Sequence, residues 1–257
     1  MLAIKNLSRY RAASYHLVIS AGIAAITLTV MLALWYPSPL FAAMGGMELI
    51  ALIVGVDVAI GPLITLVIFD TRKKELLFDL AVIALLQVAA LGYGVYTMSL
   101  ARPVFMVATD LGIRVVPAVE IDDEELAKAQ RDEFRHRPLT GPQLVAVQEP
   151  SDKKEREKIV FAALAGKGIQ NLPQYFVPYA EKRSEVVKTS RPLADLDLGD
   201  EDRAHLDAYL RRVGRKADEL RCLPVTTKRG LLTAILDANG EVLELLAIPP
   251  DLRQAQK

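Results

Sequence analysis

Long apolar stretches dominate the first hundred positions of the chain. Three runs, at 17–35, 49–69 and 80–100, carry no charged residue except Asp57 in the second. A helix needs about 20 mostly apolar residues to cross a hydrocarbon core of about 30 Å. Since the runs lack the polar stripe of a helix that faces water, the pattern predicts three membrane-spanning helices rather than a buried helical hairpin of a soluble protein.

The first run also admits a second interpretation, as a cleaved signal peptide. Small residues follow it, in the stretch Leu40-Phe41-Ala42-Ala43. The run is longer than the usual apolar segment of a signal peptide, which has about 7–15 residues, and this favours a retained helix. Either outcome leaves the later helices in the same orientation.

Lysine and arginine residues indicate which way the helices cross. They precede the first run and follow the second, whereas the loop 36–48 has none; the residues are Lys5, Arg9, Arg11, Arg72, Lys73 and Lys74. Basic residues in short loops stay on the cytoplasmic side. We therefore expect a protein of the bacterial inner (cytoplasmic) membrane, with a cytoplasmic N-terminus and segment 102–257 in the periplasm.

Charge is concentrated in the second part of the chain. Residues 1–101 hold only six of the 31 Lys and Arg residues and five of the 31 Asp and Glu residues. This contrast predicts a three-helix transmembrane domain at 1–101 and a periplasmic domain at 102–257, which is long enough to bury a core. The net charge of zero gives no reason to expect nucleic acid as a partner.

The charged segment mixes strand and helix patterns, which predicts an α+β domain. Strand patterns occur at 104–108, 113–119, 144–147, 231–236 and 241–248. Helices are predicted after an N-cap at Asp122, through Ala165 after an N-cap at Ser151, and over 201–213. Asn239-Gly240 between the last two strands is a strong hairpin signal. The stretch 172–191, with Pro173 and Pro178, is expected to be irregular.

Residues with catalytic or metal-binding chemistry are sparse. His16, His136 and His205 have no second His or Cys at metal-ligand spacing, and there is no nucleophile elbow. Cys222 is the one cysteine, so no intramolecular disulfide forms, and its neighbours Leu220 and Leu223 indicate a small core residue. We expect no enzyme activity, no cofactor and no metal.

Asp57 is the unusual feature of the apolar runs. An acid inside a membrane span costs at least about 2.5 kcal/mol unless it is paired, protonated or wet. Pro62 should kink the helix one turn away, and Gly55 and Gly61 permit close approach of another backbone. Gln87, at similar depth in the third run, is a possible internal partner, so the alternative is that Asp57 only joins the protein's own helices. The predicted contact with a partner in the membrane comprises Gly55, Asp57, Gly61, Pro62, Thr65 and Gln87.

Several segments together resemble a known family. They include Trp35-Tyr36-Pro37-Ser38-Pro39-Leu40, Gly55-Val56-Asp57, and the stretches 61–66, 78–87, 90–96 and 172–179. The chain is similar to the TfpX/TfpZ family of type IV pilin accessory proteins, also described as FimB-like fimbrial assembly proteins. The resemblance covers nearly the whole chain. It implies an inner-membrane protein without enzyme activity that assists or modulates assembly of a major type IV pilin.

The resemblance leaves open where a pilin binds and whether another function applies. Tyr175, Phe176 and Tyr179 are the predicted docking loop of the outer domain; the alternative is that they fill the domain's own core. A membrane-anchored ligand-binding sensor would need a cytoplasmic output domain, and the predicted inner segments are far too short. A small transport component that depends on Asp57 is the other alternative, although three helices with one acid are few for transport.

Overall fold

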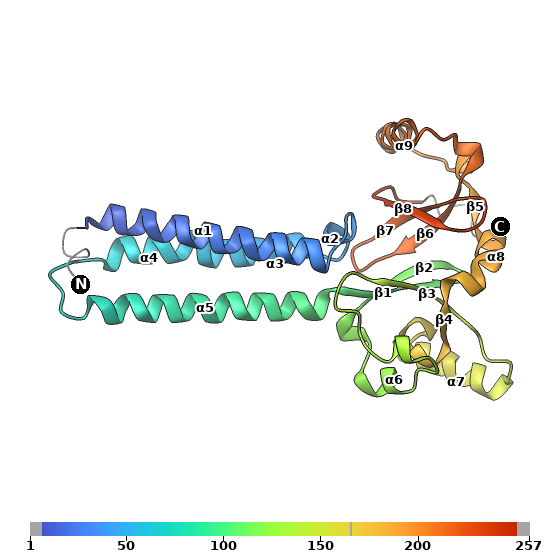
Figure 1. Cartoon of the computed structure of the whole chain (residues 1–257), viewed down its shortest axis with the longest axis horizontal. Coiled ribbons are helices and arrows are strands. Elements are labelled where there is room, and N and C mark those ends of the chain that lie inside the picture. Colours follow the sequence, from blue (N-terminus) through green and yellow to red (C-terminus); the bar gives the residue numbers. More distant parts are fainter. Residues whose placement is uncertain (1–6, 165, 251–257) are drawn as a thin grey trace. The chain divides into compact units, whose positions relative to one another are not determined.

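The computed structural model describes residues 7–164 and 166–250, which form two compact units. One unit is helical and consists of residues 7–34 and 45–100, and the other consists of residues 35–44 and 101–250. Figure 1 shows the long helices of the first unit and the strands of the second. Lys5 and Ala165, which enter the predictions above, lie outside the described residues.

The helical unit contains two long helices, α1 (Arg9–Leu34) and α5 (Leu76–Ala101). Each is 26 residues long and apolar enough to cross a membrane, and only 11% of the most apolar window of each is buried. Such low burial distinguishes them from the core helices of a water-soluble protein. A third helical run connects them in three pieces, α3 (Gly46–Val54), the π-helical η2 (Gly55–Ile60) and α4 (Gly61–Ile68). Since this run is divided, the third span stays a prediction.

The second unit is built on an eight-stranded mixed sheet with the order β4-β3-β1-β2-β6-β7-β8, and β5 pairs with β6. The pairs β1–β3 and β2–β6 are parallel, and the others are antiparallel. The strands are β1 (Pro103–Thr109), β2 (Gly112–Pro117), β3 (Gln143–Val147), β4 (Phe176–Pro178), β5 (Arg191–Pro192), β6 (Arg221–Thr226), β7 (Leu231–Leu236) and β8 (Val242–Leu246). The predicted α+β class of this unit is confirmed.

Two apolar clusters of this unit pack α6 and α9 against the sheet. The first lies at the β3–β4 end and is centred on Phe105, Phe134 and Phe176, with the Phe176 ring 5.2 Å from Phe105 and 6.1 Å from Phe134. The second, at the β6–β8 end, includes Leu206, Cys222 and Ile235. Figure 1 shows α6 and α7 near the first end and α9 near the second. The helices are α6 (Asp123–Ala127), α7 (Lys153–Leu164), α8 (Tyr179–Thr189) and α9 (Asp200–Val213).

The loop between the first two apolar runs belongs to the sheet unit. It contains the short helix α2 (Leu40–Ala43), and the side chains of Tyr36 and Leu40 are buried. The Ala43 carbonyl accepts hydrogen bonds from the Thr227 hydroxyl and the Arg229 backbone N–H, both 3.0 Å long. Arg102 lies over the Trp35 ring at 5.6 Å, a cation–π contact. Burial raises the pKa of the Tyr36 phenol.

The prediction of an irregular segment at 172–191 is wrong. The chain forms β4 there and then the 11-residue helix α8, which begins directly after Pro178. Only Tyr179 and Val186 of α8 are buried, two turns apart on one face. Two buried apolar positions among charged ones give too weak a periodicity to identify a helix from sequence, so packing on the sheet decides its structure.

The predicted helix caps also need correction. Asp122 precedes α6 but makes no capping hydrogen bond, and its carboxylate instead pairs with Lys167 Nζ at 2.6 Å. At α7 the capping acceptor is Asp152 rather than Ser151, since the Glu155 N–H donates to Asp152 Oδ2 at 3.2 Å. Strand β6 was not predicted because Pro224 stands within it, and proline is disfavoured inside strands.

Candidate functional site

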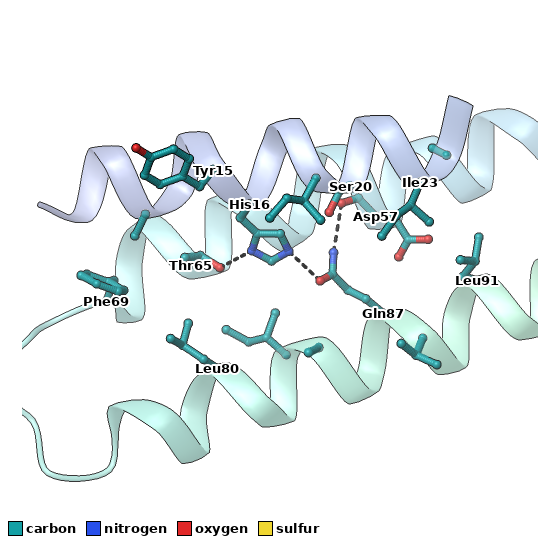
Figure 2. A pocket seen from close by; sticks show the side chains of 16 residues that line it. Tyr15, His16, Ser20, Ile23, Asp57, Thr65, Phe69, Leu80, Gln87 and Leu91 are labelled. Carbon is teal, nitrogen blue, oxygen red and sulfur yellow. Dashed lines mark hydrogen bonds between the residues drawn. The ribbon is translucent and has the colours of Figure 1, made fainter. Parts of the chain in front are cut away.

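A row of polar side chains links the helices of the apolar unit. His16 on α1 stands between Thr65 on α4 and Gln87 on α5 (Figure 2). Its Nδ1 is 2.6 Å from Thr65 Oγ1, and its Nε2 is 2.6 Å from Gln87 Oε1. The Gln87 amide continues the row, because Nε2 donates to the backbone carbonyl of Asp57 at 3.0 Å. Helices far apart in sequence are thus joined by side-chain hydrogen bonds.

The Asp57 carbonyl at the end of the row determines which group donates and which accepts in each of its hydrogen bonds. The Asp57 carbonyl can only accept, so Gln87 must present its NH2 group there and its amide oxygen to His16. His16 Nε2 therefore carries a proton and donates it in the bond to Gln87. In the neutral ring, Nδ1 then accepts a hydrogen bond from the Thr65 hydroxyl. Every member of the row is satisfied without any ionised group.

Helix η2 explains why the Asp57 carbonyl needs a partner. In this π-helical turn the Gly61 N–H bonds to the Val56 carbonyl, five residues back. The same spacing pairs the Asp57 carbonyl with residue 62, which is proline and has no N–H. A backbone carbonyl in apolar surroundings costs several kcal/mol when it is left unpaired. The Gln87 side chain supplies the missing donor.

Glycine makes this approach possible. A Cβ atom added at Gly61 would lie 2.1 Å from Gln87 Nε2, so a larger residue cannot stand there while the amide keeps its place. Further along α5, a Cβ at Gly94 would lie 2.6 Å from Ile53 Cγ1. These two glycines place α5 against the broken helix at two levels.

The carboxylate of Asp57 is separate from this row. The residue is 6% exposed, and its Oδ1 is buried with no hydrogen-bond partner among the described residues. Figure 2 shows the carboxylate directed from η2 toward α5, beside Gln87 and Leu91. It lines a cavity of about 580 Å³ whose other walls come from α1, α4 and α5. Apart from Asp57, the polar residues lining the cavity are Tyr15, His16, Ser20, Thr65 and Gln87.

This arrangement does not form a proton relay to Asp57. The row of hydrogen bonds ends at the Asp57 backbone carbonyl, which has no proton to exchange, and does not reach the carboxylate. No group of three or more His, Cys, Asp or Glu side chains able to hold a metal ion occurs among residues 7–164 and 166–250. What the site can do chemically is accept a hydrogen bond or a positive charge within apolar surroundings.

The structure brings most of the predicted membrane-contact residues together. Gly61 and Gln87 touch, and Thr65 joins them through His16. Pro62 is buried in the same unit, whereas a Cβ at Gly55 would meet no atom within 4 Å. Gln87 reaches Asp57 as expected, but at its backbone rather than its carboxylate. Whether these residues contact a partner stays a prediction.

His16 is the site residue that the sequence analysis missed. In sequence it has no second His or Cys nearby, and its partners Thr65 and Gln87 are 49 and 71 residues away. A signal was present, because Ala12, His16, Ser20 and Ala24 recur every four residues in an apolar helix. That spacing places them on one face, and a histidine on such a face needs a polar partner.

The three aromatic residues of the predicted docking loop are core side chains in the structure. Tyr175, Phe176 and Tyr179 are 9%, 2% and 6% exposed. The Tyr175 hydroxyl donates to Glu155 at 3.0 Å, and the Tyr179 hydroxyl donates to the Gly240 carbonyl at 2.6 Å. Burial raises the pKa of Tyr179 to about 12. Docking of a partner on these residues stays a prediction, and their burial agrees with the alternative that they fill the domain's core.

Comparison with known proteins places this structure in a family. The model of the family described as fimbrial assembly protein FimB matches residues 5–45. The fimbrial assembly protein of serogroup I from Dichelobacter nodosus is 32% identical over 238 residues, which is 91% of this chain and 92% of that protein. The chain belongs to the fimbrial assembly protein family.

Two other fimbrial assembly proteins are similar to the chain over different lengths. The serogroup E1 protein of Dichelobacter nodosus is 31% identical over 91% of this chain and 92% of its own length. The protein of serogroups C1 and C2 is 36% identical over 116 residues, which is 44% of this chain and 88% of that protein. No solved structure matches the chain.

Proposed function

We propose that this fimbrial assembly protein is a non-enzymatic, chaperone-like accessory protein of the bacterial inner membrane that assists or modulates assembly of type IV pilins. One observation carries the proposal: the similarity to proteins described as fimbrial assembly proteins extends over 91% of the chain and therefore includes both structural units. The shared role thus involves the apolar helices together with the sheet domain.

The physical character of the two units supports this role. A pilin subunit awaiting assembly presents an apolar helix in the bilayer and a globular head outside. A protein that holds such a subunit needs an apolar surface in the membrane and a folded domain beyond it. The exposed apolar side chains of α1 and α5 and the well-packed sheet domain have these two properties.

The proposed arrangement has three spans, with α3, η2 and α4 together forming the second. The three pieces follow one another directly from Gly46 to Ile68, about 34 Å at about 1.5 Å per residue, which is sufficient for a hydrocarbon core of about 30 Å. Lys73 and Lys74 then lie in the cytoplasm and the sheet domain in the periplasm. A reporter active only in the periplasm should be active after Lys257 and silent after Lys74. The reverse pattern would exclude a direct contact between the sheet domain and a pilin head.

Deletion of the gene in its native host tests the function itself. Surface fimbriae should decrease or change in number, while the amount of pilin transcript stays the same. Expression of the full chain from a second locus should restore them. Normal fimbriae and normal twitching in the deletion strain would contradict the proposal.

A further inference from the structure

The cavity beside Asp57 has the form of a groove along two helices. Its lining on α1 recurs at helical spacing, and so does its lining on α5; the residues are Ala12, Tyr15, His16, Ile19, Ser20, Ile23 and Ala24 on α1, and Leu80, Ile83, Ala84, Gln87, Val88 and Leu91 on α5. From Ala12 to Ala24 a helix rises about 18 Å at 1.5 Å per residue. The groove therefore follows about three turns of both helices.

One acceptor in this groove lacks a donor. The buried Oδ1 of Asp57 has no hydrogen-bond partner among the described residues, whereas His16, Thr65 and Gln87 beside it bond to one another. A buried acid in apolar surroundings is normally paired. The groove thus offers a mainly apolar lining and, at Asp57 Oδ1, an acceptor without a donor among the described residues.

We propose that this groove binds one face of an apolar helix of a partner, and that the helix brings a hydrogen-bond donor or a positive charge to Asp57. Acyl chains of lipid fit the apolar lining but have no donor at this depth, so they leave Asp57 unpaired. A helix can supply the donor from a single polar side chain while its neighbours three and four residues away meet the walls. The inference rests on the proposed function in one respect: the helix is that of the pilin.

The size of the groove fixes how the helix lies. Three turns of helix about 10 Å across occupy about 1,400 Å³, more than twice the 580 Å³ of the cavity. The partner helix therefore lies along the mouth of the groove with one face inside. Ala12, Ser20, Ala24 and Ala84 are small residues in the walls that let its backbone come close.

Photo-crosslinking from neighbouring positions of α5 tests the proposal in native membranes. A benzophenone amino acid replaces Ala84, which lines the groove, or the adjacent Leu85, which does not line it and is 69% exposed. Both positions lie at nearly the same depth, but adjacent residues of a helix point about 100° apart. The full-length protein should form an adduct with the pilin from position 84 and little from position 85. Equal yields from both positions, an adduct with lipid alone or an adduct with a second copy of the chain would overturn it.

Substitution of Asp57 tests the role of the acceptor. With the probe at position 84, Asp57→Leu should lower the yield of the pilin adduct up to about tenfold, since the hydrogen bond to the side chain of Asp57 is lost. Asp57→Asn keeps an acceptor oxygen and should retain part of the yield. Protein levels in the membrane serve as the control for folding. An unchanged yield in Asp57→Leu would remove Asp57 from the proposal.

The two proposals fail in different ways. If deletion of the gene abolishes fimbriae but position 84 gives no pilin adduct, the assembly function stands and the groove is not the contact. If deletion leaves fimbriae unchanged, the assembly function falls whatever the adducts are. A pilin adduct from position 84 together with loss of fimbriae supports both.

Discussion

The two units of this protein distribute polar and apolar side chains in opposite ways. In the sheet unit large apolar residues such as Phe105, Phe134 and Phe176 are buried, and charged residues lie outside. In the helical unit Ser20, Asp57 and Thr65 are buried, while large apolar residues are exposed outside the groove; these include Val18, Ile26, Val67, Leu77 and Leu85. Each unit fits a different solvent, water for the first and hydrocarbon for the second.

The contrast indicates what holds each unit together. Burial of apolar surface drives packing in the sheet unit, because its surroundings are water. Helices in a hydrocarbon environment gain little from apolar contact and associate through close packing and hydrogen bonds. The helical unit shows both. Close packing occurs at Gly61 and Gly94, and hydrogen bonds join the row from Thr65 to Asp57.

The largest expected effect comes from the core of the sheet unit. Phe176→Ala removes a ring that packs on Phe105 and Phe134 and should lower the free energy of unfolding by about 3–5 kcal/mol. Phe161→Ala, at a position 70% exposed on α7, is the control and should change it by less than about 0.5 kcal/mol. Thermal unfolding of the purified full chain measures both. Equal losses would mean that burial does not distinguish these rings.

In the helical unit, removal of a polar group should have the opposite sign. Asp57→Leu deletes a buried acid with an unpaired oxygen, so the helices should insert normally and gain up to about 2.5 kcal/mol in stability. Resistance of the full chain to unfolding by SDS measures the gain. Fimbriation should nevertheless fall, because the proposed contact between Asp57 and the pilin helix is lost. Full fimbriation in the variant would leave Asp57 with only a structural role.

Gly61 and Gly92 together test whether close approach of the helices stabilises the helical unit. Gly61→Ala puts a methyl group where the Gln87 amide lies, so the amide loses its bonds to His16 and Asp57 and the unit loses about 1–2 kcal/mol. Gly92→Ala meets no atom within 4 Å and should gain about 0.5–1 kcal/mol from helix propensity. The same SDS titration compares them. Loss of stability in both variants would show that glycine is required for another reason.

The smallest effect concerns Cys222, which reports on the sheet unit alone. Burial raises the pKa of its thiol to about 11 from an ordinary 9.0. The folded domain therefore holds the thiol proton more tightly than the unfolded chain does. This contribution to the free energy of unfolding is complete below about pH 9 and is lost as pH rises toward 11. At pH 8 iodoacetamide should react with Cys222 only after the domain unfolds. The control is Leu139→Cys in a chain that also carries Cys222→Ser. Since position 139 is 81% exposed, its thiol should react at once. Rapid labelling of native Cys222 would contradict its burial.

The sequence alone determined the features that depend on neighbouring residues. Apolar runs of the required length identified α1 and α5, short apolar runs bounded by turn residues identified β1, β2, β3, β7 and β8, and Asn239-Gly240 identified the last hairpin. The apolar face of 201–213 likewise identified α9. These signals are local, because the length of an apolar run and the geometry of a turn are properties of consecutive residues.

Only the tertiary structure decided what depends on residues far apart in the chain. It showed α8 where too few apolar residues mark a helix, β6 around Pro224, and the burial of Tyr175, Phe176 and Tyr179, whose docking role stays a prediction. It also joined His16 to Thr65 and Gln87 across three helices and showed that, among the residues it describes, Asp57 Oδ1 has no donor. No pattern of neighbours reveals such pairings, because a hydrogen bond between helices depends on how the helices are rotated and how closely they pack.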